Sequence, residues 1–362
     1  MKTILIDINH PAHVHLFKYF IKEMKSRGYR VIVTAKEVKI IMHLLDVYGI
    51  EYIKVGKKKD AIVLKYLYEL FHLLKVWLLV WKYNVSYGLG ISMVLPILSK
   101  LTPMKVIALD DDDLLVTPTF AKAISYANII LNPSSLSFEE RGSNRICHDS
   151  FHELAYLHPN RFVAQPYVMA ELGIQKEERF FIMRFNVFKA HHDAGAQGLN
   201  LAQKLELITL LQPFGRIFIT TERDIEPELK DYQLAVAPEK IHALMYYATL
   251  FIGDSQTMIS EAAILGTPSV KLNSFAGILS IPNEIEHQHG LCYSYLPTQY
   301  NEMKQKIKEL LTIENIKEEW QKKRQKMLSK KIDLTSFLVE IINNYPDYPQ
   351  SLKYKSDKLV TQ

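Results

Sequence analysis

Short apolar runs alternate with amphipathic stretches at the start of the chain, and short polar turns separate them. The apolar run Thr3–Ile8 predicts a buried strand, and the periodic stretch Val14–Arg27 predicts a helix. The next elements alternate in the same way, as the strand Tyr29–Thr34, the helix Val38–Tyr48 and the strand Glu51–Val55. This order, with its short loops, predicts a parallel, doubly wound sheet with right-handed crossovers.

The alternation continues and then restarts after a poorly periodic stretch at Gln165–Glu178. Before this stretch, we predict strands at Val85–Leu89, Lys105–Leu109 and Tyr126–Leu131 and helices at Ala61–Trp81 and Ser92–Leu101. After it, we predict strands at Arg179–Phe185, Arg216–Thr220 and Thr249–Ile252 and helices at Asn200–Leu211, Ile241–Tyr247, Glu302–Leu311 and Ile316–Leu328. The chain is thus expected to form two α/β domains, 1–165 and 179–335, with a linker at 166–178 and a C-terminal tail at 336–362. In such folds ligands bind outside the carboxyl ends of the strands, here in a cleft between the domains.

One stretch of the second half, Ile252–Val270, predicts a strand, a tight turn and a helix in close succession. Gly266 suits the left-handed position at the end of that helix, and Pro268 prevents its continuation. The start of a helix presents unpaired N–H groups and the positive end of the helix dipole, which suits a phosphate.

Polar side chains lie at this predicted helix start. Ser255, Gln256 and Thr257 add donors beside the amides, and Glu261 follows Thr257 by one turn. One interpretation is a nucleotide-diphosphate site in which Glu261 accepts hydrogen bonds from a ribose diol. The alternative is an ordinary strand–turn–helix unit with a solvated glutamate.

The composition excludes few classes of protein. The chain has 362 residues, of which 48% are hydrophobic, so it is long enough for two domains. A net charge of +5 is consistent with an anionic ligand or a membrane surface, and we expect no nucleic-acid partner. Cys147 and Cys292 provide neither a disulfide framework nor metal spacing, and no signal-peptide pattern occurs. We therefore expect a cytoplasmic protein.

The most membrane-like stretch is Ala61–Trp81. Its charged residues interrupt the roughly 20 apolar residues that a membrane span requires, so we predict a core helix. The second interpretation is a helix in the membrane interface, with Trp77, Trp81 and Lys82 near the headgroups. This second interpretation places the protein peripherally at the inner face of the cell membrane.

Histidines and carboxylates follow two predicted strands of the first half. His13 falls in a first helical turn, where the positive helix end favours a neutral imidazole that accepts a proton. A capping role and one leg of a metal site are the alternatives. Asp110–Asp113 follow the strand that ends at Leu109. Asp110 is a candidate general base, whereas a divalent-cation site and a solvated acidic turn are the alternatives for the run.

In the second half, Arg184 ends a predicted strand, and His191 and His192 follow it. We expect Arg184 to clamp a diphosphate and His192 to bind or protonate the leaving phosphate. Loop packing is the alternative for both histidines. The chain has no GxSxG, Walker or GxGxxG motif, which argues against serine hydrolases, P-loop NTPases and simple dehydrogenases.

Several motifs resemble those of one prokaryotic family of unknown function, which is related to GT-B glycosyltransferases and to non-hydrolysing UDP-N-acetylglucosamine 2-epimerases. They are DINHPAHVHLFKYF, HELAYLHPNRF, MRF, HHDAGAQGL and GDSQTMISEAAILGTPSV. The resemblance runs from the first strand to about Val270. It implies a GT-B-like α/β fold of two Rossmann-like, doubly wound domains with an interdomain cleft.

The resemblance also implies roles for individual residues. In the wider GT-B group, including MurG-type transferases, the loop before the late helix binds the diphosphate and a glutamate at the place of Glu261 binds the ribose. His13 matches the histidine that opens the first helix of those transferases. Two departures stand out: Asn9-His10-Pro11 replaces the glycine-rich first loop, and Asp110–Asp113 replaces an Asp-Thr-Glu-like motif.

The leading hypothesis is therefore a metal-independent glycosyltransferase that requires no cofactor and uses a nucleotide-diphosphate sugar as donor. We expect a sugar or lipid-linked acceptor, in surface polysaccharide or glycolipid biosynthesis. His13 or Asp110 would deprotonate the acceptor, and Arg184, Ser255, Gln256, Thr257 and Glu261 would bind the donor. The alternatives are a 2-epimerase-like enzyme and a non-catalytic nucleotide-sugar-binding protein.

Overall fold

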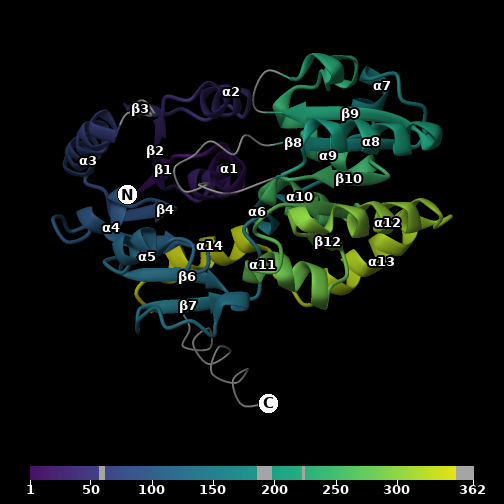
Figure 1. Cartoon of the computed structure of the whole chain (residues 1–362). Helices are drawn as coiled ribbons and strands as arrows, with labels where there is room; N and C mark the ends of the chain where they lie inside the picture. The colour runs from purple at the N-terminus through teal and green to yellow at the C-terminus, as the bar shows by residue number, and fades with distance from the viewer. Residues whose placement is uncertain (57–61, 186–197, 222–224, 348–362) are drawn as a thin grey trace. The chain divides into compact units, whose positions relative to one another are not determined.

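The computed structural model describes residues 1–56, 62–185, 198–221 and 225–347 (Figure 1). The chain forms two compact units. Unit 1 comprises Met1–Arg161 and Lys331–Gln362, and unit 2 comprises Phe162–Lys330. Each unit is built around one parallel sheet.

The sheet of unit 1 has the strand order β3-β2-β1-β4-β5-β6-β7 within the described residues, and all its neighbouring strands are parallel. The strands are β1 (Thr3–Ile8), β2 (Arg30–Lys36), β3 (Ile53–Gly56), β4 (Tyr87–Gly90), β5 (Lys105–Leu109), β6 (Ile129–Pro133) and β7 (Arg145–His148). The helices are α1 (Pro11–Ser26), α2 (Lys39–Val47), α3 (Ile62–Lys82), α4 (Val94–Leu98), α5 (Pro118–Ile124), α6 (Leu154–Leu157) and α14 (Leu334–Asn344). β1 is buried along its whole length, and four of its six residues are apolar, as expected for a central parallel strand.

The sheet of unit 2 has the order β12-β11-β10-β8-β9, again with parallel neighbours in the part that the structure describes. The strands are β8 (Phe180–Phe185), β9 (Arg216–Thr221), β10 (Leu250–Gly253), β11 (Ser269–Leu272) and β12 (Cys292–Tyr295). The helices are α7 (Tyr167–Glu171), α8 (Leu201–Leu211), α9 (Ile241–Tyr247), α10 (Gln256–Ile264), α11 (Ser280–Asn283), α12 (Tyr300–Leu311) and α13 (Ile316–Leu328). The predicted pair of parallel α/β sheets is therefore confirmed.

The sequence prediction omits β7 and β12, which are the last strands of their sheets in chain order. Both are short: Arg145–His148 reads RICH, and Cys292–Tyr295 reads CYSY. Neither segment is a continuous apolar run, so the pattern that identifies the central strands is missing at these edges.

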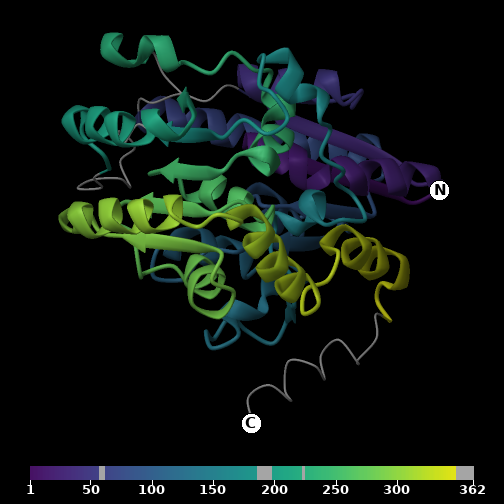
Figure 2. The same cartoon turned by 90° about the vertical axis from the view of Figure 1, so that its right-hand side faces the viewer.

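The compact units have other boundaries than the predicted domains 1–165 and 179–335. α7 lies inside the predicted linker 166–178, and α14 begins at Leu334, before the predicted tail 336–362. The carboxylate of Asp333 caps α14 by accepting the N–H of Ser336 at 3.2 Å, and it also binds Arg161 at 2.7 Å. α14, yellow in Figure 2, packs against α1 and α6, so the end of the chain returns to unit 1.

The predicted core helix is α3, but only one of its faces lies in the core. Val76, Leu79 and Val80 pack in the core of unit 1 together with residues of β1, α4 and β5. The opposite face is exposed although its residues are large and apolar. A core helix is therefore an incomplete description of this segment.

Candidate functional site

The strand–turn–helix of unit 2 forms where the sequence predicts it. The turn is held by two hydrogen bonds: the N–H of Asp254 donates to Arg184 O at 3.1 Å, and Asn273 Nδ2 donates to Asp254 O at 3.0 Å. Ser255 is the N-cap of α10, and its side chain makes no capping hydrogen bond within the described residues. The first-turn amides of α10 are therefore not covered by that side chain, as a phosphate site requires.

The strand register places two cationic side chains on either side of Gly253. In the sheet, Gly253 pairs with Arg184 of β8 and with Lys271 of β11. Paired residues of neighbouring parallel strands project from the same face of the sheet. Both side chains therefore lie beside the turn that leads into α10. Arg184 Nη1 donates to Thr220 Oγ1 at 3.1 Å, and Lys271 Nζ donates to Gln256 Oε1 at 2.7 Å.

Lys271 is a site residue that the sequence prediction misses. Its side chain is almost fully buried, and burial lowers the pKa of Lys271 to about 8, although Cys292 and Glu286 raise it. An anion beside Nζ would stabilise the charged form and reverse this shift. The signal in the sequence is a lysine inside the apolar strand SVKL, next to the predicted phosphate turn.

The other predicted donor-binding residues differ in their surroundings. Glu261 is buried, and His242 Nε2 lies 2.9 Å from its Oε1. Thr257 is exposed, and Gln256 is half-buried. Any ribose contact of Glu261 would have to share the carboxylate with His242 of α9. The structure thus groups Ser255, Gln256, Arg184 and Lys271 around the turn, whereas Glu261 lies deeper.

In unit 1, His13 lies in the first turn of α1, where the N–H of Asn9 donates to its Nδ1 at 3.4 Å. Burial, together with the charges of the neighbouring His10 and His152, lowers the pKa of His13 to about 3. The lowered pKa favours the neutral imidazole, and desolvation is its largest cause. Since Nδ1 accepts a hydrogen bond, Nε2 carries the proton, and His13 offers a donor at that atom.

The acidic run after β5 contains residues in different environments. Asp110 is buried, forms an ion pair with Arg141, and accepts the N–H of Asp112 at 3.2 Å. Burial raises the pKa of Asp110 to about 6 against the opposing effect of Arg141. Carboxylate oxygens of Asp110, Asp111 and Asp112 lie within 4.8 Å of one another. Arg141 already neutralises part of this charge, so the run by itself does not indicate a cation site.

Asp111 and His152 form a pair that sequence reasoning does not identify. His152 Nδ1 lies 3.0 Å from Asp111 Oδ2, and His152 Nε2 is buried with no hydrogen-bond partner among the described residues. Burial lowers the pKa of His152, but the Asp111 carboxylate outweighs burial and the net pKa is raised. For Asp111, the charge of His152 likewise outweighs burial, and the pKa is lowered.

His148, at the end of β7, is also buried, and neither of its ring nitrogens has a partner in the described ranges. Burial and the charge of His152 lower the pKa of His148 to about 3. We call His13, Asp111, His148 and His152 the imidazole cluster, since electrostatic interactions connect them. The sequence signal that could have identified His152 as a site residue is its place at the start of the family motif HELAYLHPNRF.

Two of the remaining sequence predictions do not enter this description. His191 and His192 lie outside the described residues.

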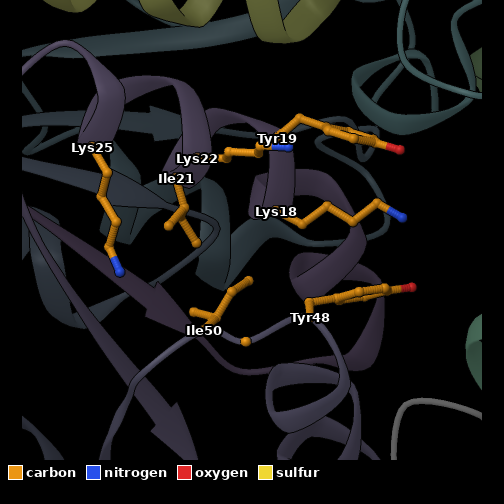
Figure 3. A pocket seen from close by; sticks show the side chains of 8 residues that line it. Lys18, Tyr19, Ile21, Lys22, Lys25, Tyr48 and Ile50 are labelled. Carbon is orange, nitrogen blue, oxygen red and sulfur yellow. The ribbon is translucent and has the colours of Figure 1, made fainter.

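A surface hollow of about 300 Å³ lies between α1 and the end of α2, and it contains none of the predicted site residues (Figure 3). In this hollow, the ammonium of Lys18 lies 4.5 Å from the ring centre of Tyr48 and 5.0 Å from that of Tyr19.

Comparisons with known structures support the fold. The chain is similar to a UDP-N-acetylglucosamine 2-epimerase, with a TM-score of 0.69, 11% identity and 97% of both chains covered. It is also similar to S. aureus MnaA in a structure with UDP, with a TM-score of 0.65, 12% identity, and 95% of this chain and 97% of that one covered. The spinosyn rhamnosyltransferase SpnG, in complex with spinosyn aglycone, gives a TM-score of 0.61, 13% identity, and coverages of 95% and 100%. The GT-B-like fold that the sequence predicts is thereby confirmed.

Sequence comparisons identify a family but no activity. Residues 2–347 match a family described as a protein of unknown function, DUF354. No curated protein matches the chain significantly. The predicted kind of family, of unknown function and related in fold to GT-B glycosyltransferases and 2-epimerases, is therefore confirmed.

Proposed function

Because the chain belongs to the DUF354 family of unknown function, we infer its activity from its own two groups of residues, and we propose that it is a glycosyltransferase. It transfers a sugar from a nucleotide-diphosphate donor to an acceptor hydroxyl. Similar folds occur in proteins whose structures are named as a rhamnosyltransferase and as 2-epimerases, which supports a nucleotide sugar as the ligand class. The acceptor we propose is a lipid-linked or polysaccharide precursor.

One observation carries the proposal: a buried lysine and a strand-end arginine flank the turn that leads into α10. Lys271 and Arg184 both pair with Gly253, and α10 starts three residues later. In the proposed reaction, these two cations and the first-turn amides stabilise the charge that grows on the leaving diphosphate. Because fixed protein charges perform this task, it requires no metal ion.

The acceptor needs a group that takes its proton. We propose His152 for this role, in place of the predicted candidates His13 and Asp110. In neutral His152, a proton on Nδ1 is held by Asp111 at 3.0 Å, and Nε2 presents its lone pair. When Nε2 accepts the acceptor's proton, the Asp111 carboxylate stabilises the imidazolium that forms. In this proposal, His13 offers a hydrogen-bond donor at Nε2, because its Nδ1 accepts from Asn9, and Asp110 positions the loop through its ion pair with Arg141.

The reaction is tested by incubating the full chain with a panel of nucleotide sugars and candidate hydroxyl acceptors. We expect release of free nucleoside diphosphate that depends on the acceptor, and binding of nucleoside diphosphate without an acceptor. If no nucleotide binds, or if Lys271→Gln and Arg184→Gln both leave the nucleotide affinity unchanged, the donor site is wrong.

A 2-epimerase-like activity is the second candidate, and the imidazole cluster is the observation that favours it. Epimerisation removes and returns a proton at the sugar, so it needs acid and base groups such as neutral His148 and His152 with Asp111. Conversion of UDP-N-acetylglucosamine in the absence of any acceptor would assign this reaction. Binding without turnover, unchanged in His152→Gln, would instead assign a non-catalytic binding protein.

A further inference from the structure

α3 is apolar on both faces although only one face is buried. Its inner face packs in the core of unit 1. Its outer face consists of large apolar residues with exposed fractions between 37% and 59%: Leu67, Leu70, Phe71, Leu74, Trp77, Leu78 and Trp81. A helix that is apolar all round is ordinarily buried, and a large exposed apolar patch ordinarily marks an interaction site.

Exposed apolar residues also occur in α4 and just before and after it. Met93, Ile97 and Leu101 recur at four-residue spacing and are exposed, and α4 contacts α3 (Figure 1). We call the ten exposed apolar residues of both segments the α3–α4 surface.

One buried and one half-buried polar contact fix which face of α3 is turned outward. His72 Nε2 lies 3.0 Å from Asp7 Oδ1 of β1, and Lys36 of β2 donates to Glu69 at 2.5 Å. Burial lowers the pKa of His72, but Asp7 outweighs burial and raises it to about 9, so the pair is charged at neutral pH. Turning the apolar face inward would break these charged contacts. The exposure of the α3–α4 surface therefore follows from how α3 is fixed to the sheet.

The charges around the surface favour one kind of occupant. From Leu67 to Leu101, where the side chains are described, the chain has three lysines and one glutamate, and that glutamate, Glu69, already binds Lys36. Anionic lipid headgroups complement such a lysine-rich margin. A second copy of the chain, docked by two-fold symmetry, would bring the lysines of both copies together at the rim. The tryptophans Trp77 and Trp81 also suit the boundary between headgroups and acyl chains.

We propose that the α3–α4 surface docks on an anionic lipid bilayer, with α3 lying in the plane of the headgroups. Among the described residues, no helix is long and apolar enough to cross a membrane, so α3 is assigned to the interface. The inference deepens the acceptor part of the proposed function, because a lipid-linked acceptor would be presented at such a surface. It does not depend on the chemistry of the donor site.

The test is co-sedimentation of the full chain with phosphatidylglycerol–phosphatidylcholine vesicles and with pure phosphatidylcholine vesicles. We expect the protein to pellet with the anionic vesicles and to do so less as the salt concentration rises. Trp320 is buried in unit 2, so a blue shift of tryptophan emission on binding reports on Trp77 and Trp81. A Trp320→Phe variant isolates that signal.

The test variant carries two substitutions on the α3–α4 surface, Leu74→Ser and Leu78→Ser. The control variant carries Ile278→Ser in unit 2. Leu74 and Ile278 are both 50% exposed, so the cost of each substitution to folding is similar. We expect the double variant to lose roughly tenfold or more in vesicle partitioning, because apolar burial in the bilayer is removed, and Ile278→Ser to bind like the wild type. We expect Lys82→Gln to bind anionic vesicles about fivefold more weakly.

Two results would overturn the proposal. One is a wild-type chain that stays in the supernatant with both kinds of vesicle. The other is a dimer in solution that dissociates in the Leu74→Ser, Leu78→Ser variant while vesicle binding is absent, which would assign the surface to a second copy. Nucleotide binding measured on the same double variant separates the two proposals, because it should remain unchanged whether or not vesicles bind.

Discussion

At the scale of single residues, the two groups of candidate site residues contain titratable side chains whose pKa values are shifted by burial and by their partners. Lys271 and His152 are the clearest cases, because each is buried and each has one defined partner. Their pKa shifts have opposite directions, lower for Lys271 and higher for His152. The proposed reaction therefore depends on pH in two separable ways.

Lys271 should control donor affinity. The pKa of Lys271 is about 8, so the affinity for a nucleoside diphosphate should fall as pH rises through that value, since the charged ammonium is lost. A bound anion would move this transition upward. Lys271→Gln should weaken binding by roughly 10- to 100-fold and remove the pH dependence, measured by calorimetric titration. Lys304→Gln, at a surface ion pair with Glu206, serves as the control and should bind like the wild type.

His152 should control turnover. Because Asp111 raises its pKa, the wild-type kcat/KM should rise with pH through a value above the ordinary 6.5 of histidine. Asp111→Asn should move this rise to lower pH, and His152→Gln should reduce kcat by about 10² or more. Donor binding should stay unchanged in both variants, as should all parameters of the surface variant His43→Gln. An unshifted pH profile in Asp111→Asn would remove His152 from the mechanism.

At the scale of elements, the junction of β10 and α10 depends on the close approach of two strands at Gly253. A Cβ built on Gly253 would lie 2.1 Å from Arg184 O, which is far inside van der Waals contact. Gly253→Ala should therefore destabilise unit 2 by about 3 kcal/mol, measured by urea unfolding. Gly173→Ala is the control, because Gly173 has a positive φ but nothing close to its side-chain position, and it should cost about 1 kcal/mol. Equal costs would mean that the strand approach is not the constraint.

Elements also show where pattern reading succeeds. Lys105–Leu109, Ile241–Tyr247 and Ile316–Leu328 form at the predicted residues, because a buried strand and an amphipathic helix each have a strong apolar period. α3 shows the limit of the same signal. Periodicity indicates that the helix is apolar. Which of its faces is buried depends on the contacts of His72 with β1 and of Glu69 with β2.

At the scale of the whole molecule, the end of the chain completes unit 1. Apolar residues of α14, including Phe337, Leu338 and Ile341, are buried against α1 and α6. A chain that stops at Lys330 should therefore unfold at lower urea concentration in unit 1 than the wild type. Because α14 packs on helices of unit 1, hydrogen exchange of β8 and β10 in unit 2 should stay unchanged. Faster exchange in unit 2 than in unit 1 would contradict this assignment.

The sequence by itself determined the class of fold, the order of the central elements and the strand–turn–helix at Gly253, because each rests on contiguous residues with a strong period or turn signal. It also determined the family, through motifs that are likewise contiguous. Only the tertiary structure decided which side chains share a site: Lys271 with Gln256, Asp111 with His152, Asp110 with Arg141 and Glu261 with His242. These partners are separated by between 15 and 41 residues, and strand register and helix packing bring them together. No local pattern encodes that register, so the chemistry of the site became visible only in the folded chain.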